Sequence, residues 1–205
     1  MSSNLLTRTL TSLILIVILS FGLFYNDTSW KILVIILLIL SFFEFYNLIN
    51  KIYINKIFVR IIIFLTLLYL YFFYYLLIRV RIEFGEEIIL ILLIACISSD
   101  IGGYTIGKLI GGPKLTSISP NKTISGAIGS IIFTIIGTSL FIFFLKEIYK
   151  GPILFEFSSV IFIWMIMISV YCQIGDLFVS YLKRKAKVKD TGRILPGHGG
   201  ILDRV

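Results

Sequence analysis

The sequence has few of the residues on which several protein classes depend. It contains two cysteines in 205 residues, Cys96 and Cys172, and both lie in or beside apolar runs. Their separation fits no metal-ligand spacing, so we expect two small apolar side chains with no redox or metal role. No hydrophilic stretch is long enough for a separate soluble domain. The sequence shows no repeat of fixed period, as an inverted-repeat transporter would. It also has no basic stripe on a soluble module, as a nucleic-acid-binding protein would.

Apolar residues are what the chain has in excess. They form 58% of it, and the mean hydropathy is +1.02, which exceeds what a soluble domain with a wetted surface needs. Six runs approach the ~20 residues that cross a bilayer as a helix. These runs are Leu10–Tyr25, Trp30–Ile49, Phe58–Ile78, Ile88–Lys108, Ile124–Leu145 and Leu154–Leu182. No small-residue cleavage site follows the first run, so we expect a retained helix.

Positive charge is distributed unevenly between the loops that join these runs. The formal net charge is +8, and fourteen of the 19 Lys and Arg fall on one side of the six expected spans. Lysine and arginine concentrate in cytoplasmic loops. We therefore predict an all-α polytopic membrane protein of about six transmembrane helices, with both termini in the cytoplasm. Residues 1–205 form a single membrane domain in this prediction, with N-terminal helices over 1–85 and a catalytic half over 86–205.

Small residues recur at a spacing of about four between the fourth and fifth runs. They are Gly103, Gly107, Gly111, Ser125 and Gly129. This spacing allows helix backbones to approach closely inside a membrane bundle. Packing alone therefore explains these positions better than chemistry does.

Ionisable and polar groups at membrane depth are costly and mark functional sites by default. Asp100 interrupts the fourth run, and Tyr104 and Lys108 share its face on a helix. Asp100 fits either a polar cavity or a structural pair with Lys108. Ser119 and Lys122 lie in the next loop, where a proline ends the helix and hydroxyl, amide and ammonium donors follow. That pattern is typical of a phosphate site and of an ordinary turn alike.

The last run and the tail carry the most specific pattern. A polar stripe at i, i+3, i+7 and i+10 of the last helix consists of Gln173, Asp176, Ser180 and Lys183. The tail continues with Lys183-Arg184, then Lys189-Asp190, then Pro196-Gly197-His198-Gly199-Gly200-Ile201-Leu202-Asp203-Arg204. Asp176 and Asp203 are two carboxylates able to face one site, and carboxylates beside phosphates are the usual ligands of Mg²⁺. A basic tail that binds anionic lipid explains the cations but not the run from Pro196 to Arg204.

The stretch from Ser180 to Arg204 resembles the signature of phosphatidate cytidylyltransferases: Ser, Lys-Arg, four residues, Lys-Asp, then Pro-x-His-Gly-Gly-x-x-Asp-Arg. The resemblance continues upstream at residues 173–176, 119–123 and 100–104, and Glu44 stands where the family often has a glutamate. It implies a multi-pass enzyme of the bacterial inner (plasma) membrane, with a polar cavity open to the cytoplasm. Phosphatidate attacks the α-phosphorus of CTP in such enzymes, pyrophosphate leaves, and a divalent cation such as Mg²⁺ is required. The family is generally dimeric, so a homodimer is expected.

The resemblance also implies a role for each matched residue. Asp176, Lys183 and Asp203 would be catalytic, and the two carboxylates would hold the metal. The expected substrate-binding residues are Asp100, Ser119, Lys122, Ser180, Arg184, Lys189, His198 and Arg204.

The chain departs from the family pattern at three places, of which Gly103 in place of a common alanine matters little. Family members commonly have Trp-Glu-Gly where this chain reads Ile124-Ser125-Gly126, and they continue beyond the Asp-Arg pair with another Asp and a hydrophobic segment. The sequence is therefore interpreted as a fragment, as a chain completed by another polypeptide, or as a weakened enzyme. Two other hypotheses stay open. One is a different lipid enzyme, such as a polyprenol kinase, and the other is a non-catalytic homologue that binds or transports lipid.

Overall fold

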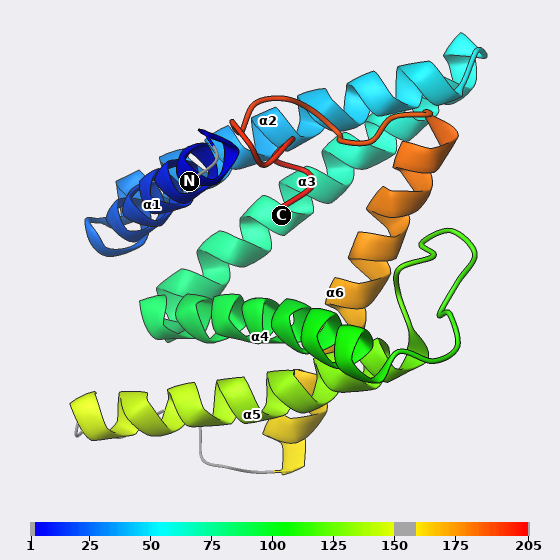
Figure 1. Ribbon diagram of the computed structural model, residues 1–205. Coiled ribbons are helices and arrows are strands. Elements are labelled where there is room, and N and C mark those ends of the chain that lie inside the picture. Colours follow the sequence, from blue (N-terminus) through cyan, green and yellow to red (C-terminus); the bar gives the residue numbers. More distant parts are fainter. Residues whose placement is uncertain (1–2, 150–158, 205) are drawn as a thin grey trace. The chain divides into compact units, whose positions relative to one another are not determined.

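The computed structural model describes residues 3–149 and 159–204, and six α-helices account for most of these residues (Figure 1). The helices are α1 (Ser3–Phe24), α2 (Asp27–Ile52), α3 (Lys56–Phe84), α4 (Glu86–Ile110), α5 (Ile124–Tyr149) and α6 (Ser159–Lys185). Each is long enough and apolar enough to cross a membrane. The predicted all-α, multi-pass membrane architecture is confirmed at this level. The predicted start of the last run, Leu154, lies outside the described residues.

Short polar or glycine links separate the first four helices. Asn26 opens α2 through a capping box, because its Oδ1 accepts the Ser29 N–H at 2.7 Å and its own N–H donates to Ser29 Oγ at 3.1 Å. Gly85 alone separates α3 from α4, with a φ of +81° that favours glycine. The first four helices therefore follow one another without long loops.

The chain divides into two compact units, Met1–Ile82 together with Tyr181–Val205, and Glu83–Ser180. The first unit contains α1, α2, nearly all of α3 and the segment we call the C-terminal loop, residues 186–204. The second contains α4, α5 and most of α6. Figure 1 shows the C-terminal loop, in red, lying against α1 and α2. The loop was predicted as part of the catalytic half, yet it packs with the N-terminal helices.

An apolar cluster fixes the base of the C-terminal loop in the first unit. Leu48, Ile49, Val59 and Leu182 are buried together, and Leu202 of the loop packs against them. Burying aliphatic side chains of this size contributes about 1.5–3 kcal/mol each. The last turn of α6 and the end of the loop are thereby held against α2 and α3.

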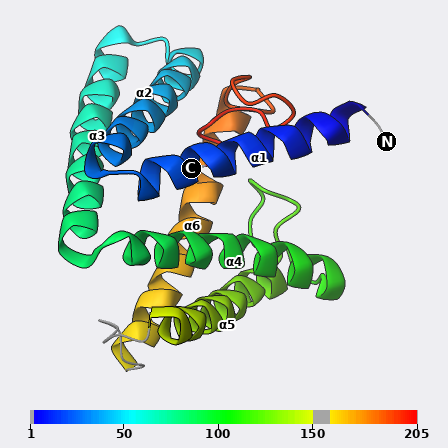
Figure 2. The ribbon, with the colours of Figure 1, turned by 90° about the vertical axis from the view of Figure 1, so that its left-hand side faces the viewer.

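In the second unit, α4 and α5 lie side by side in both views (Figures 1 and 2). A Cβ at Gly102 would collide with the carbonyl oxygen of Gly129, and a Cβ at Gly126 would lie 2.8 Å from the carbonyl oxygen of Gly103. Glycine is therefore required where the two backbones touch. The packing interpretation of Gly103 and Gly129 is confirmed.

Two of the predicted small residues have other roles. Gly111 is the C-cap of α4, with a φ of +65° and no atom within 4 Å of where a Cβ would stand. Ser125 donates its hydroxyl to the Gly111 carbonyl oxygen. These residues close the connection between α4 and α5 and do not pack the helices together, because α4 has already ended at Gly111.

Candidate active site

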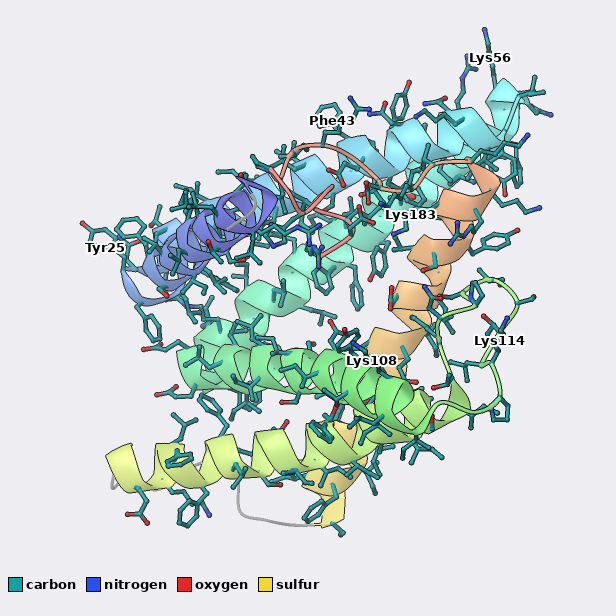
Figure 3. The ribbon with its side chains drawn as sticks, in the orientation of Figure 1. Tyr25, Phe43, Lys56, Lys108, Lys114 and Lys183 are labelled. Carbon is teal, nitrogen blue, oxygen red and sulfur yellow. The ribbon has the colours of Figure 1, made fainter. Side chains whose placement is uncertain are left out.

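The C-terminal loop encloses a carboxylate, that of Asp203, whose side chain is 8% exposed. Lys183, labelled at the end of α6 in Figure 3, pairs with Oδ1 at 2.6 Å. Oδ2 accepts the Thr191 N–H at 2.8 Å and the Gly200 N–H at 3.1 Å, and it lies 3.0 Å from the Thr191 hydroxyl oxygen. Burial alone would raise the pKa of Asp203. The hydrogen bonds from Lys183, Thr191 and Gly200 outweigh that effect, and the pKa of the carboxyl lies below its usual range.

A second carboxylate, that of Glu44 on α2, lies beneath the same loop and is 3% exposed. Its Oε1 accepts the Ile201 N–H at 3.0 Å, and its Oε2 accepts the Leu202 N–H at 2.9 Å. Oε2 also accepts the Thr191 hydroxyl at 2.7 Å. Neither Glu44 nor Thr191 was among the predicted site residues. Glu44 carried a signal, since an acid inside an apolar run is costly, whereas Thr191 carried none.

Glycines let the loop backbone approach these carboxylates. A Cβ at Gly192 or Gly200 would collide with the Glu44 carboxylate. Gly197 and Gly199 have φ values of +75° and +90°. Gly197 and Gly199, on either side of His198, therefore take backbone conformations that favour glycine.

The tip of the loop is held by one face of α1. Arg8 Nε donates to the Gly197 carbonyl oxygen at 2.9 Å, and the Thr11 hydroxyl donates to the Pro196 carbonyl oxygen at 3.0 Å. The Ser12 hydroxyl lies 3.3 Å from Nε2 of His198, the residue that follows Gly197. The first helix therefore contributes three side chains to the folding of this loop.

Several predicted phosphate-binding cations of the first unit remain exposed. They are Arg184, Lys189 and Arg204. Arg204 also donates to the His198 carbonyl oxygen at 3.2 Å. Their charges are accessible to an anionic ligand, whereas that of Lys183 is already paired with Asp203.

The second unit contains another predicted pair. Lys122 forms an ion pair with Oδ2 of Asp176, whose side chain is 57% exposed. The Lys122 N–H donates to the Ser119 carbonyl oxygen at 3.0 Å, so residues 119–122 form a turn, and a phosphate site here stays a prediction. The loop between α4 and α5 and the helix α6 are thus brought together at Lys122 and Asp176, which are 54 residues apart in the sequence.

A polar path connects α4, α5 and α6 beside this pair. Gln173 donates to the Ala127 carbonyl oxygen and to Ser169 Oγ, both at 3.3 Å. Ser169 Oγ lies 3.0 Å from the hydroxyl of the buried Ser99. Asp100, the residue after Ser99, is exposed on α4. The polar stripe predicted on α6 therefore faces partly into this helix packing.

The two cysteines also lie together, with 3.3 Å between the sulfur atoms of Cys96 on α4 and Cys172 on α6. Both are free thiols and half-buried. The sequence predicted two small apolar side chains, and nothing in their spacing indicated that they meet.

The predicted metal-binding carboxylates belong to different units, Asp176 to the second and Asp203 to the first. Ser180 is the last residue of the second unit. Within residues 3–149 and 159–204, no three His, Cys, Asp or Glu side chains form a group that could hold a metal ion. A cation shared by Asp176 and Asp203 stays a prediction.

A model of the cytidylyltransferase family matches residues 51–205, most of the chain. The chain belongs to the cytidylyltransferase family. Its C-terminal loop and the Lys122–Asp176 pair both lie within the matched part. The side chains of α1 and α2 that hold the loop precede it.

Curated relatives in this family bear the name phosphatidate cytidylyltransferase. The protein from Helicobacter pylori (strain J99) is 41% identical over 124 residues, which cover 60% of this chain and 43% of the relative. The Bacillus subtilis (strain 168) protein is 43% identical over 114 residues, 54% of this chain and 40% of the relative. The Brucella suis protein is 42% identical over 126 residues, 60% of this chain and 43% of the relative. The match thus spans less than half the length of these relatives.

Proposed function

We propose that this family member transfers the cytidylyl group of CTP to phosphatidate, giving CDP-diacylglycerol and pyrophosphate. The observation that carries the proposal is the folded C-terminal loop. The last turn of the apolar helix α6 carries exposed Arg184, and the loop that follows carries exposed Lys189 and Arg204 and an ionised Asp203. Clustered positive charge at a membrane edge suits a triphosphate and a lipid phosphate together. The names of the relatives support the same reaction.

The reaction requires positioning more than covalent work from the protein. A phosphate oxygen of phosphatidate attacks the α-phosphorus of CTP, and a new P–O bond forms. The bond from the α-phosphorus to the oxygen that bridges it to the β-phosphorus breaks, and its electron pair leaves with pyrophosphate. Phosphatidate is already anionic, so no strong general base is needed. The arginines and lysines of the loop neutralise the gathered phosphates and align them.

Mg²⁺ is proposed as the cofactor, with Asp176 and Asp203 as the residues that would hold it. Carboxylate oxygens are the donors this ion prefers. Asp176 fits, because its side chain is 57% exposed beside its ion pair with Lys122. Asp203 fits in charge only: it is ionised at neutral pH because its pKa is lowered, but its side chain is 8% exposed and both of its oxygens already have partners in Lys183, Thr191 and Gly200. The bound ion would supply charge neutralisation for the triphosphate.

We further propose an inner-membrane location with both termini and the polar cavity on the cytoplasmic side. The concentration of Lys and Arg in the loops and termini of one side supports this orientation. A homodimer belongs to the same proposal, and so does substrate binding by Asp100, Ser119, Lys122, Ser180 and His198.

The test is a transfer assay with the purified chain in lipid nanodiscs, Mg²⁺, phosphatidate and CTP labelled at the α- or γ-phosphate. We expect lipid labelled from the α-phosphate and pyrophosphate labelled from the γ-phosphate, whereas a lipid kinase would label lipid from the γ-phosphate. Asp176→Asn should lower transfer on the order of a hundred-fold, and Glu147→Gln, an exposed acid on α5, serves as its matched control. An inactive wild-type chain would refute the function. Full turnover by Asp176→Asn would remove that residue from the mechanism.

A further inference from the structure

We propose that Glu44 is a positioning residue that fixes the shape of the C-terminal loop and, through Thr191, the place of Asp203. Its effect on catalysis rests on the proposed function. Its effect on the loop does not.

The carboxylate of Glu44 joins the two ends of the loop. Thr191 stands near the beginning of the loop, and Ile201 and Leu202 stand near its end. All three donate to Glu44, over 2.7–3.0 Å. Thr191 and Ile201 are 8% and 5% exposed, so water does not replace the lost acceptor easily. Removing the carboxylate would leave both ends of the loop without their shared anchor.

Thr191 connects Glu44 to Asp203. Its hydroxyl lies 2.7 Å from Oε2 of Glu44 and 3.0 Å from Oδ2 of Asp203, and its N–H donates to the same Oδ2 at 2.8 Å. A hydroxyl has one proton and donates it to one carboxylate at a time. The position of Thr191 is therefore set by both acids, and a shift of Glu44 is transmitted to Asp203.

The loop backbone is shaped to the Glu44 carboxylate. Side chains are excluded at Gly192 and Gly200, where a Cβ would collide with the carboxylate. Burying an acid in an apolar helix is costly unless it is hydrogen-bonded, and the donors that satisfy it here come from the loop. Residue 44 also precedes the residues 51–205 that match the family model. The loop is therefore positioned by a residue that precedes the matched part.

The direct test is residue-resolved amide hydrogen exchange on the full chain in nanodiscs without substrate. Glu44→Gln keeps the length of the side chain but leaves one acceptor oxygen for the N–H groups of Ile201 and Leu202. We expect exchange at one or both of these amides to rise about tenfold or more. Ser41→Ala, on the same helix, is the matched control, because its buried hydroxyl has no hydrogen-bond partner among the described residues. Wild-type exchange at both amides in Glu44→Gln would overturn the proposal.

Glu44→Asp keeps the charge and both acceptor oxygens but withdraws them by one methylene. It serves if Glu44→Gln does not fold, and it too should raise exchange at Ile201 and Leu202. Unchanged exchange in Glu44→Asp, when Glu44→Gln is not recovered, overturns the proposal equally.

The effect of Glu44→Gln on catalysis is measured as kcat and KM per folded molecule. Misplaced loop groups should lower kcat about tenfold, while KM for CTP changes less than about threefold, because the exposed cations still reach the triphosphate. A raised exchange with wild-type kcat would show that Glu44 holds the loop without positioning the site, and the proposal would fail. If the wild-type chain transfers no cytidylyl group, the proposed function fails instead, and exchange alone decides the role of Glu44 in the loop.

Discussion

The ion pair of Lys183 and Asp203 gives a prediction whose size follows from the structure. Asp203→Asn keeps the shape of the side chain but leaves one acceptor oxygen. The best orientation aims this oxygen at Thr191 and Gly200, and the amide NH₂ then faces the Lys183 ammonium. The two side chains of the pair are 22% and 8% exposed. Losing one charge-assisted hydrogen bond there costs about 1.5–3 kcal/mol.

That cost should appear as easier opening of the C-terminal loop. A loss of about 2 kcal/mol raises the open population roughly 30-fold, because each ~1.36 kcal/mol is a factor of ten. The loop contains exposed Lys187, Lys189 and Arg193, so trypsin reports its opening if the loop recloses faster than it is cut. We expect cleavage at these sites to accelerate about 30-fold in metal-free buffer. Cleavage of Asp203→Asn at the wild-type rate would refute the reasoning.

A double-mutant cycle separates the pair from its surroundings. Lys183→Met removes the same ion pair from the other side, so the double variant Lys183→Met, Asp203→Asn should open less than the sum of the two single effects. Strict additivity would mean that the ion pair contributes nothing and that Asp203 acts through the backbone of Thr191 and Gly200 alone.

The pH dependence of loop opening has a definite sign. Because the folded-state pKa of Asp203 is lowered, its contribution to loop stability is complete above the unfolded-state pKa and is lost as the pH falls through the folded value. Loop closure should therefore persist from pH 7 to about 4 and weaken below that. The rate of cleavage by pepsin, which is active in acid, measures the opening of the loop at low pH. This rate should depend less on pH in Asp203→Asn than in the wild type.

Two further predictions concern the packing of the second unit. Gly129→Leu should lower the stability of this unit by about 1–3 kcal/mol, because the added side chain meets Ile106 on α4. Gly175→Ala should change the melting temperature little, because no atom lies within 4 Å of where the new Cβ would stand. Mild oxidation should join Cys96 and Cys172, whose sulfur atoms lie 3.3 Å apart, into an intramolecular disulfide visible by mass spectrometry after digestion. Wild-type stability of Gly129→Leu would contradict the packing of α4 against α5, and the absence of this disulfide after oxidation would contradict the packing of α4 against α6.

The sequence predicted the helices better than their ends. The third apolar run was placed at Phe58–Ile78, but α3 extends over Lys56–Phe84. Hydropathy measures preference for lipid, while the helix continues as long as backbone hydrogen bonds can form. Charged residues such as Arg79, Arg81 and Glu83 remain helical at its end. The limits of a membrane run and of a helix therefore have different physical causes.

The site residues were found by motif, but their partners were not. Asp176 and Asp203 were predicted to share a cation, and the structure gives each a nearby ammonium group, Lys122 and Lys183. The spacing of a motif identifies which residues carry charge. It does not contain the tertiary contact that decides which charge each one meets, because Lys122 and Asp176 come from a loop and a helix that only folding brings together.

Glu44 shows what kind of contact sequence analysis detects least. Its partners include two backbone N–H groups, 157 and 158 residues away, and almost every residue carries such a group. No side-chain pattern at positions 201 and 202 could therefore indicate the contact. What the sequence retains is indirect: an acid inside an apolar helix, and glycines in a distant loop where the carboxylate leaves no room for a Cβ. An acid of this kind has to find its donors in the fold, and a loop with glycine where a close approach requires it is the place to search.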